Sequence, residues 1–254
     1  MPEHIFQIDI ASIINSQTDD WSRKWTMEME NAFKNSDNHL RLLANLLVME
    51  QYINTLRQGL AASGKTLSAG LERACNILWD FLDSRIAPTD FEDFANDYYD
   101  CLLAYNVGET TDTPKEFYDK YFAGSDPDAY ELLAIEWSSG LLMQLVAIAD
   151  GNVDFEEFED CERIDFYGIS IMLSILEDAC IGLTNTPCSG DMESRKEALT
   201  QVHRSTLFQE IIKHVRDCVQ TALNAAPDTY ESLRHEYVQY PIISAEYASA
   251  LLLE

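Results

Sequence analysis

Apolar side chains recur three and four residues apart along most of the chain, which is the spacing of one face of an α-helix. Trp21, Trp25, Met29 and Phe33 follow one another at intervals of four and predict an aromatic stripe packed into the core. No stretch resembles a pair of alternating strands. We therefore predict an all-α fold of about eight helices in a single bundle-like domain that covers residues 1–254. The predicted helices span Asp19–Phe33, Leu40–Leu60, Leu67–Ile86, Thr89–Tyr105, Thr113–Gly124, Tyr130–Ala149, Phe166–Leu183 and Glu193–Leu223, with a short helix from Pro227.

The segment from Tyr130 to Leu183 is the stretch around which we expect the fold to be organised. Its two ends, Tyr130–Ala149 and Phe166–Leu183, are apolar around most of their circumference, as helices are when they are buried on several sides. The link between them is dense in carboxylates and predicts a helix hairpin with an acidic crest. The link contains Asp150, Asp154, Glu156, Glu157, Glu159, Asp160, Glu162 and Asp165 against a single basic residue, Arg163.

The charge of the whole chain points to the same kind of surface. The sequence has 44 acidic and 17 basic residues, a formal net charge of -27 at pH 7, with an ordinary hydrophobic share of 46%. Such a charge repels nucleic acid and anionic membranes and attracts basic surfaces. We therefore predict a basic protein as partner, no nucleic acid and no membrane. Solubility or a salty habitat is an equally good explanation of the charge.

The cysteines and the apolar runs indicate a cytoplasmic protein. No two of the six cysteines form a C-x-x-C pair, and no histidine lies at ligand spacing from any of them. The start of the sequence, Met1–His4, lacks the basic and apolar regions of a secretion signal. The longest apolar run, Leu141–Ala149, is too short to cross a bilayer. We predict reduced thiols and a cytoplasmic location.

Gly59–Thr66 matches the phosphate-loop pattern G-x4-G-K-T. In nucleotide-binding proteins this loop follows a buried strand and points its backbone amides at the phosphates. The preceding residues here, Tyr52–Gln58, mix apolar and polar side chains at helical spacing. We therefore expect a helix that ends near Gly59 and a short loop, without a nucleotide site.

The acidic link also resembles part of an EF-hand calcium loop over Asp150–Phe158. The first and third ligand positions would then be Val146 and Ile148, which have no side-chain oxygen, whereas calcium needs six to eight oxygens. Glu159 and Glu162 have the E-x-x-E spacing of the all-α nucleotide pyrophosphatases that bind magnesium, but the E-x-x-D that should follow is absent. We predict no metal and no cofactor.

None of the five histidines has a nucleophile as an evident partner in the sequence. A histidine within an apolar helical repeat is more often a hydrogen-bonded core residue than a base. We expect His214 to be of that kind, and we predict no catalytic residue.

Two segments, Leu71–Leu82 and Asp165–Gly168 leading into Ala179, resemble the YjaG-like family of small bacterial all-α proteins of unknown function. The acidic, helical character without catalytic residues is also similar to immunity proteins that neutralise bacterial polymorphic toxins. The first resemblance implies an all-α fold. The second implies a toxin, such as a nuclease, as the basic partner.

The function predicted from these observations is an acidic cytoplasmic binding protein, an immunity or inhibitor protein that docks on a basic partner. The alternatives are a magnesium-dependent hydrolase with helix-borne carboxylates and an uncharacterised helical scaffold protein. A separate interpretation of the acidic crest is that it is only a solvated face. The predicted partner-binding residues are Asp150, Asp154, Glu156, Glu157, Glu159, Asp160 and Glu162.

Overall fold

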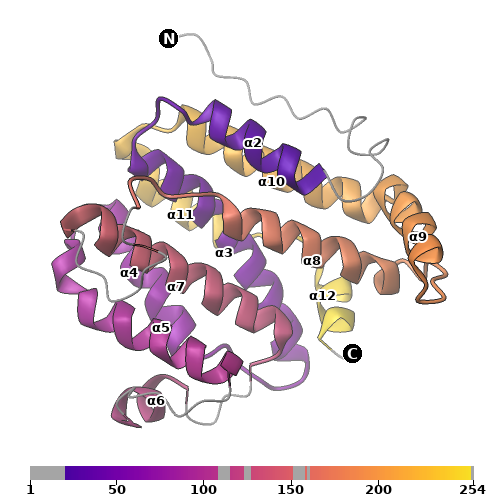
Figure 1. Cartoon of the computed structure of the whole chain (residues 1–254), viewed down its shortest axis with the longest axis horizontal. Coiled ribbons are helices and arrows are strands. Elements are labelled where there is room, and N and C mark those ends of the chain that lie inside the picture. Colours follow the sequence, from indigo (N-terminus) through magenta and orange to yellow (C-terminus); the bar gives the residue numbers. More distant parts are fainter. Residues whose placement is uncertain (1–20, 108–114, 123–126, 151–157, 159–160, 253–254) are drawn as a thin grey trace.

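The computed structural model describes residues 21–107, 115–122, 127–150, 158 and 161–252. Within these residues the fold is all-α, with eleven α-helices, two 3₁₀ turns and no strand (Figure 1). The predicted fold class is confirmed, whereas the predicted number of about eight helices is too low. The α-helices are α2 (Trp21–Ala32), α3 (Asn38–Ala62), α4 (Ala69–Leu82), α5 (Glu92–Val107), α6 (Lys115–Tyr121), α7 (Ala129–Asp150), α8 (Tyr167–Leu183), α9 (Met192–Arg204), α10 (Thr206–Asn224), α11 (Tyr230–Tyr237) and α12 (Ala245–Leu251), and the 3₁₀ turns span Pro88–Asp90 and Pro227–Thr229.

The single helix predicted over Glu193–Leu223 is in fact two helices, α9 and α10, that meet at Ser205. The backbone of Ser205 is extended, with φ -69° and ψ 147°, and its hydroxyl accepts a hydrogen bond from the amide of Phe208. Serine competes with the helix for backbone hydrogen bonds and is favoured as an N-cap. The apolar spacing alone does not distinguish a serine inside a helix from one that starts a new helix.

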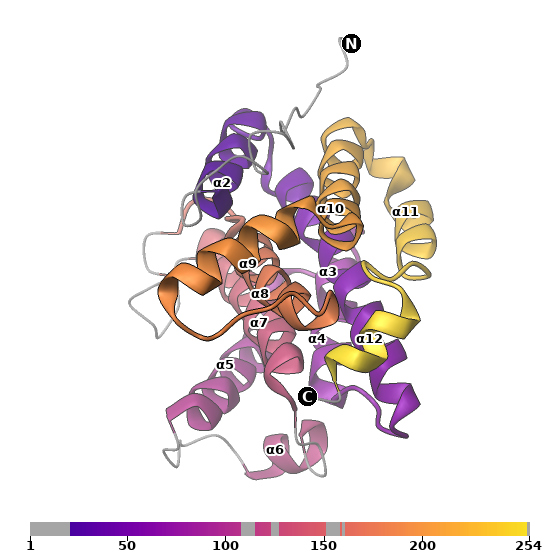
Figure 2. The same ribbon diagram turned by 90° about the vertical axis from the view of Figure 1, so that its right-hand side faces the viewer.

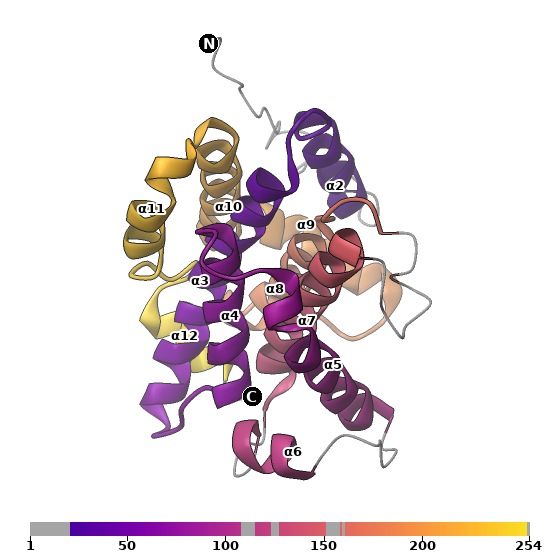
Figure 3. The same cartoon turned by 90° about the vertical axis from the view of Figure 1, so that its left-hand side faces the viewer.

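α3 lies at the centre of the fold. Nearly every side chain from Arg41 to Leu60 is buried, and α4, α7, α8, α10, α11 and α12 pack around this helix (Figures 1, 2 and 3). A helix surrounded on all sides must be apolar on most faces or have its polar groups satisfied by hydrogen bonds. α3 is apolar on most faces, and its buried polar residues Asn45 and Glu50 make hydrogen bonds to other parts of the chain. The organising element is therefore α3 rather than the hairpin between Tyr130 and Leu183.

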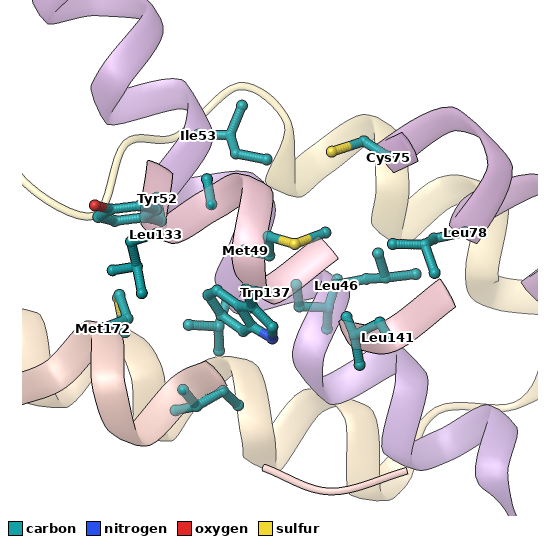
Figure 4. Packing of buried hydrophobic residues seen from close by; sticks show 14 of the residues in the cluster. Leu46, Met49, Tyr52, Ile53, Cys75, Leu78, Leu133, Trp137, Leu141 and Met172 are labelled. Atoms are coloured by element: carbon teal, nitrogen blue, oxygen red, sulfur yellow. The ribbon is translucent and has the colours of Figure 1, made fainter. Parts of the chain in front are cut away.

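The two apolar halves of the predicted hairpin form α7 and α8, which pack against each other and against α3. A Cβ atom added at Gly168, near the start of α8, would collide with the indole of Trp137 in α7, so only glycine permits this approach. Trp137 lies in the buried cluster with Leu46 and Met49 of α3 (Figure 4). The close contact fixes where α8 begins relative to α7.

The aromatic stripe predicted for the first helix is confirmed. Trp21, Trp25, Met29 and Phe33 are each at most 3% exposed. The side chain of Thr26 donates to Ser170 at 2.9 Å, which ties α2 to α8. These contacts close the fold on the side seen at the top of Figure 1.

One helix of the described residues is long and apolar enough to cross a membrane, the 21-residue segment Ala129–Ala149 of α7. It is longer than the run Leu141–Ala149 that the sequence indicated. Within the fold 72% of its most apolar window is buried. This burial is typical of a core helix in a soluble protein.

Candidate functional site

Most of the predicted partner-binding residues lie outside the described residues. This applies to Asp154, Glu156, Glu157, Glu159 and Asp160. Asp150 is the last residue of α7, and its side chain is not described either. Glu162 is exposed, as a docking residue must be.

The described end of the link is held against α3 by buried or half-buried amide side chains. Asn38 Nδ2 donates to the carbonyl of Glu162 at 3.4 Å, and Asn38 Oδ1 accepts from the amide of Ile164 at 3.1 Å. Asn45 Nδ2 donates to the carbonyl of Asp165 at 2.9 Å. Because α3 binds the backbone of the link, the side chains of Glu162 and Asp165 remain exposed.

Arg41 is the charged member of this attachment. It is 1% exposed, and its Nη2 donates to both carboxylate oxygens of Glu30 at 2.7 and 2.6 Å. Its Nε donates to the carbonyl of Ile164, and its guanidinium lies 4.6 Å from the centre of the Phe166 ring. A buried arginine of this kind holds the backbone in place and is not free to bind a ligand.

The acidic link adjoins α5, which carries no basic residue. The rings of Tyr99 in α5 and Phe158 in the link lie 5.6 Å apart. α6 packs on α5 through the ring of Phe94, which contacts Phe117 and Tyr121. We call the surface carboxylates of these two helices the acidic pole. Its described members are the exposed Asp93, Glu116 and Asp119 and the half-buried Glu92, Asp97 and Asp100, and α6 also carries the exposed Lys115 and Lys120.

Much of the negative charge of the chain falls in one stretch of the sequence that includes α5 and α6. Between Ile86 and Glu162 the sequence has 20 acidic residues and two lysines, so this stretch accounts for 18 of the 27 net negative charges. α5 and α6 lie at one end of the molecule, the lower end in Figures 1 and 2. The like charges are close enough to affect one another: burial raises the pKa of the Asp97 carboxyl, and the charge of Asp93 raises it further.

The phosphate-loop resemblance has a structural explanation that excludes a nucleotide site of that type. Gly59 lies inside α3, where an added Cβ would approach the carbonyl of Ala248 in α12 to 2.6 Å. Gly64 has φ +72° and ends the helix: its amide donates to Ala61, and the amide of Lys65 donates to Leu60. These two bonds define a Schellman motif. The segment therefore presents the carbonyl end of a helix, whereas phosphate binding requires the amide end.

Among the described residues, no group of three His, Cys, Asp or Glu side chains is placed to hold a metal ion. The EF-hand resemblance falls mostly on residues outside this description, as does Glu159 of the E-x-x-E pair. The prediction for His214 is wrong, because this residue is on the exposed face of α10. The buried histidine is His203, which hydrogen-bonds Glu177, and the same carboxylate accepts from Trp21 Nε1 at 2.9 Å.

A cleft of about 610 Å³ opens between α3, α4 and α11. Figure 3 shows the ribbons of these three helices. α3 contributes residues seven apart, Glu50 and Arg57, which lie on one face of the helix. Ile53 and Cys75 line the cleft and lie at one edge of the buried cluster (Figure 4). We call this the arginine cleft. Its charged lining residues are Glu50, Arg57, Glu72, Arg85, Glu231 and Arg234.

Glu50 is the buried charge-bearing group of the arginine cleft. It is 5% exposed, and its Oε1 accepts from Trp79 Nε1 at 2.7 Å. Burial raises the pKa of Glu50, against the opposing effects of the Trp79 hydrogen bond and of the charges on Arg57 and Arg234. The guanidinium of Arg234 lies 5.6 Å from the centre of the Trp79 ring. The cleft therefore has a buried carboxyl in its lining, with the fully buried Trp79 behind it and the charges of Arg57 and Arg234 close by.

Cys75, the thiol of the cleft, is not set up as a nucleophile. It is 7% exposed, and burial raises its pKa well above the ordinary 9.0, with a further increase from the charge of Glu50. The thiolate is the reactive form, so a thiol with a raised pKa is inert at neutral pH. The arrangement suits binding better than covalent catalysis.

Sequence reasoning missed this cleft. Glu50 and Arg57 belong to a helix whose apolar residues cover several faces, and nothing local marks them as ligand-facing. One clue exists: a glutamate between Met49 and Gln51 in a helix buried all round needs a partner. That partner, Trp79, and the covering Arg234 come from other helices, which only the folded chain brings together.

Comparisons with known proteins do not assign this arrangement to a class. No protein-family model matches the sequence, and no curated protein or solved structure matches the chain.

Proposed function

We propose that the protein is an acidic binding protein that docks on a basic protein through the acidic pole and the adjoining link. The observation that carries the proposal is the uneven distribution of charge: 18 of the 27 net negative charges belong to residues 86–162, which include α5, α6, α7 and most of the link. Charge that serves only solubility can be spread over the whole chain. Charge that attracts a basic partner must be concentrated in one region.

The chemistry of the described residues supports binding rather than catalysis. The one thiol in the large cleft has a raised pKa, and the buried histidine is hydrogen-bonded to a buried carboxylate. The magnesium-dependent alternative needs carboxylates that converge on an ion, and the described residues offer no such group. A basic toxin such as a nuclease, in the cytoplasm of the producing cell, is the partner class that fits the charge.

Electrostatics also predicts how the complex forms. Complementary charge raises association rates by about 10- to 1000-fold, and the effect weakens as salt shortens the Debye length. A protein that must sequester a harmful basic enzyme benefits from speed. Association should therefore be fast at low ionic strength and slow steeply as salt is added.

Site-specific crosslinking tests the proposal. A photo-crosslinking amino acid replaces Asp93 on α5 or, as control, Glu193 on α9, which lies away from α5 and α6 (Figure 1). Both positions are exposed, so neither substitution disturbs the core. In cells of the natural host, position 93 should capture a basic protein that position 193 does not. Capture of an acidic protein, equal capture at both positions, or no capture at position 93 contradicts the proposal.

The captured partner then allows a quantitative test with matched variants. Asp93→Asn with Asp97→Asn removes two charges from the pole, and Glu193→Gln with Glu197→Gln removes two exposed charges from α9. The first pair should slow association by about tenfold or more and reduce its salt dependence, because close charges contribute most to steering. The second pair should leave both nearly unchanged. Equal effects of the two pairs indicate non-specific attraction and refute docking at the pole.

A further inference from the structure

We propose that the arginine cleft binds a small organic carboxylate, with the anionic group held by Arg57 and Arg234. This inference does not rest on docking at the acidic pole. The two surfaces are built from different helices, so either proposal can fail while the other holds.

The two arginines are not neutralised by ion pairs. Within the described residues Arg57 has no hydrogen bond and no ion pair, although it lies close enough to Glu50 to influence that carboxyl. Arg234 donates to a neutral acceptor, the side-chain carbonyl of Asn76, at 2.6 Å. Arg85 is different, because Asp80 and Asp83 both pair with it. Neither Arg57 nor Arg234 therefore has a carboxylate partner in the described residues.

Both guanidinium groups act on the buried end of the cleft. Arg57 is exposed and Arg234 is half-buried, and each affects the electrostatics of Glu50 and of the Cys75 thiol, two groups that are almost fully buried. Glu50 accepts from Trp79 and makes no ion pair with either arginine in the described residues, so both arginines keep donors for a ligand. An entering carboxylate can accept hydrogen bonds from them.

The remaining lining selects for a ligand with an apolar part. Ile53 is 2% exposed and Cys75 is 7% exposed, and half-buried Val238 faces them from beyond the end of α11. The volume of about 610 Å³ is within the usual range for small-molecule sites. The planar fork of a guanidinium matches a carboxylate in two parallel hydrogen bonds.

A cationic ligand fits this cleft less well. Glu72 and Glu231 are exposed, as is Arg57, so water screens these three charges alike, whereas Arg234 is half-buried and screened less. Glu50, the buried acid, already accepts from Trp79, and its pKa is raised. The position of the charges therefore favours an anion at the floor, with the glutamates at the rim.

Isothermal titration calorimetry with three probes tests the proposal. Benzoate carries a carboxylate on an apolar ring, benzylammonium carries the opposite charge on the same ring, and inorganic phosphate lacks the ring. Benzoate should bind, and the other two should bind at least about tenfold more weakly. Absence of benzoate binding up to about 10 mM, or equal binding of benzylammonium, overturns the proposal. Tighter binding of phosphate than of benzoate overturns the assigned ligand class.

Matched variants locate the site. Arg57→Gln should weaken benzoate binding by about ten- to a hundredfold, because it removes a charged hydrogen-bond donor. Arg57→Lys, which keeps the charge but loses the fork, should weaken it less. Arg73→Gln removes an exposed arginine of α4 that does not line the cleft and should change binding less than about twofold. Equal weakening by the Arg57→Gln and Arg73→Gln variants shows that benzoate responds only to net charge, and then the assigned site is wrong.

Discussion

The acidic pole and the arginine cleft use charge in opposite ways. At the pole, carboxylates of α5 and α6 stand at the surface with only Lys115 and Lys120 as basic residues of these helices, and burial and then the charge of Asp93 raise the pKa of Asp97. In the cleft, arginines from separate helices surround a buried glutamate that hydrogen-bonds a tryptophan. Charges at the pole act over a distance and on large partners, whereas charges in the cleft act at contact and on small ones. One strongly acidic chain thus offers two recognition surfaces of different scale.

The two regions also differ in the contacts that hold them in place. The described end of the link is attached through buried polar groups of α3, above all Arg41 and Asn45. The cleft is formed by the packing of three helices and exposes its arginines to solvent on one side. Changes to the attachment should therefore cost stability. Changes at the rim of the cleft should cost binding only.

The largest effect is expected from Arg41→Met. The change removes the donor to the Ile164 carbonyl and leaves Glu30 without its partner. The loss should be about 3 kcal/mol, mainly because the buried Ile164 carbonyl loses its charged donor, while Glu30, whose side chain is 42% exposed, can be hydrated. Urea unfolding measures the loss. Arg73→Met, on the exposed face of α4, is the control and should stay within about 0.5 kcal/mol of the wild type.

Gly168→Ala should destabilise the protein by about 1–3 kcal/mol, because the new methyl group collides with the indole of Trp137. The comparison is Gly140→Ala in α7, where no atom lies within 4 Å of the added Cβ. That change should stabilise the helix by about 0.5–1 kcal/mol. Thermal unfolding of the two variants should move in opposite directions. A shift in the same direction means that α7 and α8 do not approach each other as described.

Glu50→Gln should change how stability depends on pH. Because burial raises the folded-state pKa of Glu50 above its ordinary value of 4.5, ionisation of this group opposes folding. Its contribution to stability is therefore greatest at low pH and is lost as pH rises from about 4.5 through the folded-state pKa. Glutamine keeps an acceptor for Trp79 and removes this slope. Unfolding free energies of both proteins across this range, subtracted from one another, should show the difference grow with pH in favour of the variant.

The smallest effect is expected at the pole itself. Asp93 and Asp97 lie four residues apart on α5, and like charges at this spacing destabilise a helix by about 0.2–0.5 kcal/mol. Asp97→Asn should recover part of that energy, and the gain should shrink as salt is added. A loss of stability that salt does not affect indicates that Asp97 has a structural partner and that the pole is not simply crowded charge.

The fold class followed from the sequence because helical spacing is local. The stripe from Trp21 to Phe33 and the apolar face of α10 both pack as their spacing predicted. The central role of α3 did not follow. Its buried polar residues, such as Arg41 and Asn45, resemble surface positions until the link backbone that they bind is in place.

The two candidate sites also differ in how far the sequence predicts them. Carboxylates of the link are visible in the sequence because they lie within a short stretch, and α5 was overlooked as their neighbour because Tyr99 and Phe158 meet only in the fold. The arginine cleft depends on α11, which is far in the chain from α3 and α4. The local pattern of residues does not predict which distant helices pack together.

The central claim is that the two surfaces sort ligands by charge and size, and one nuclear magnetic resonance experiment tests it most directly. Amide spectra of the labelled protein are recorded with benzoate and, separately, with a short oligolysine peptide. Benzoate should shift amides along Glu50–Arg57, Glu72–Asn76 and Glu231–Val238, and oligolysine should shift those of α5 and α6. Shifts by both probes at the same amides, or by oligolysine evenly over all exposed carboxylates including those of α9, would contradict the account.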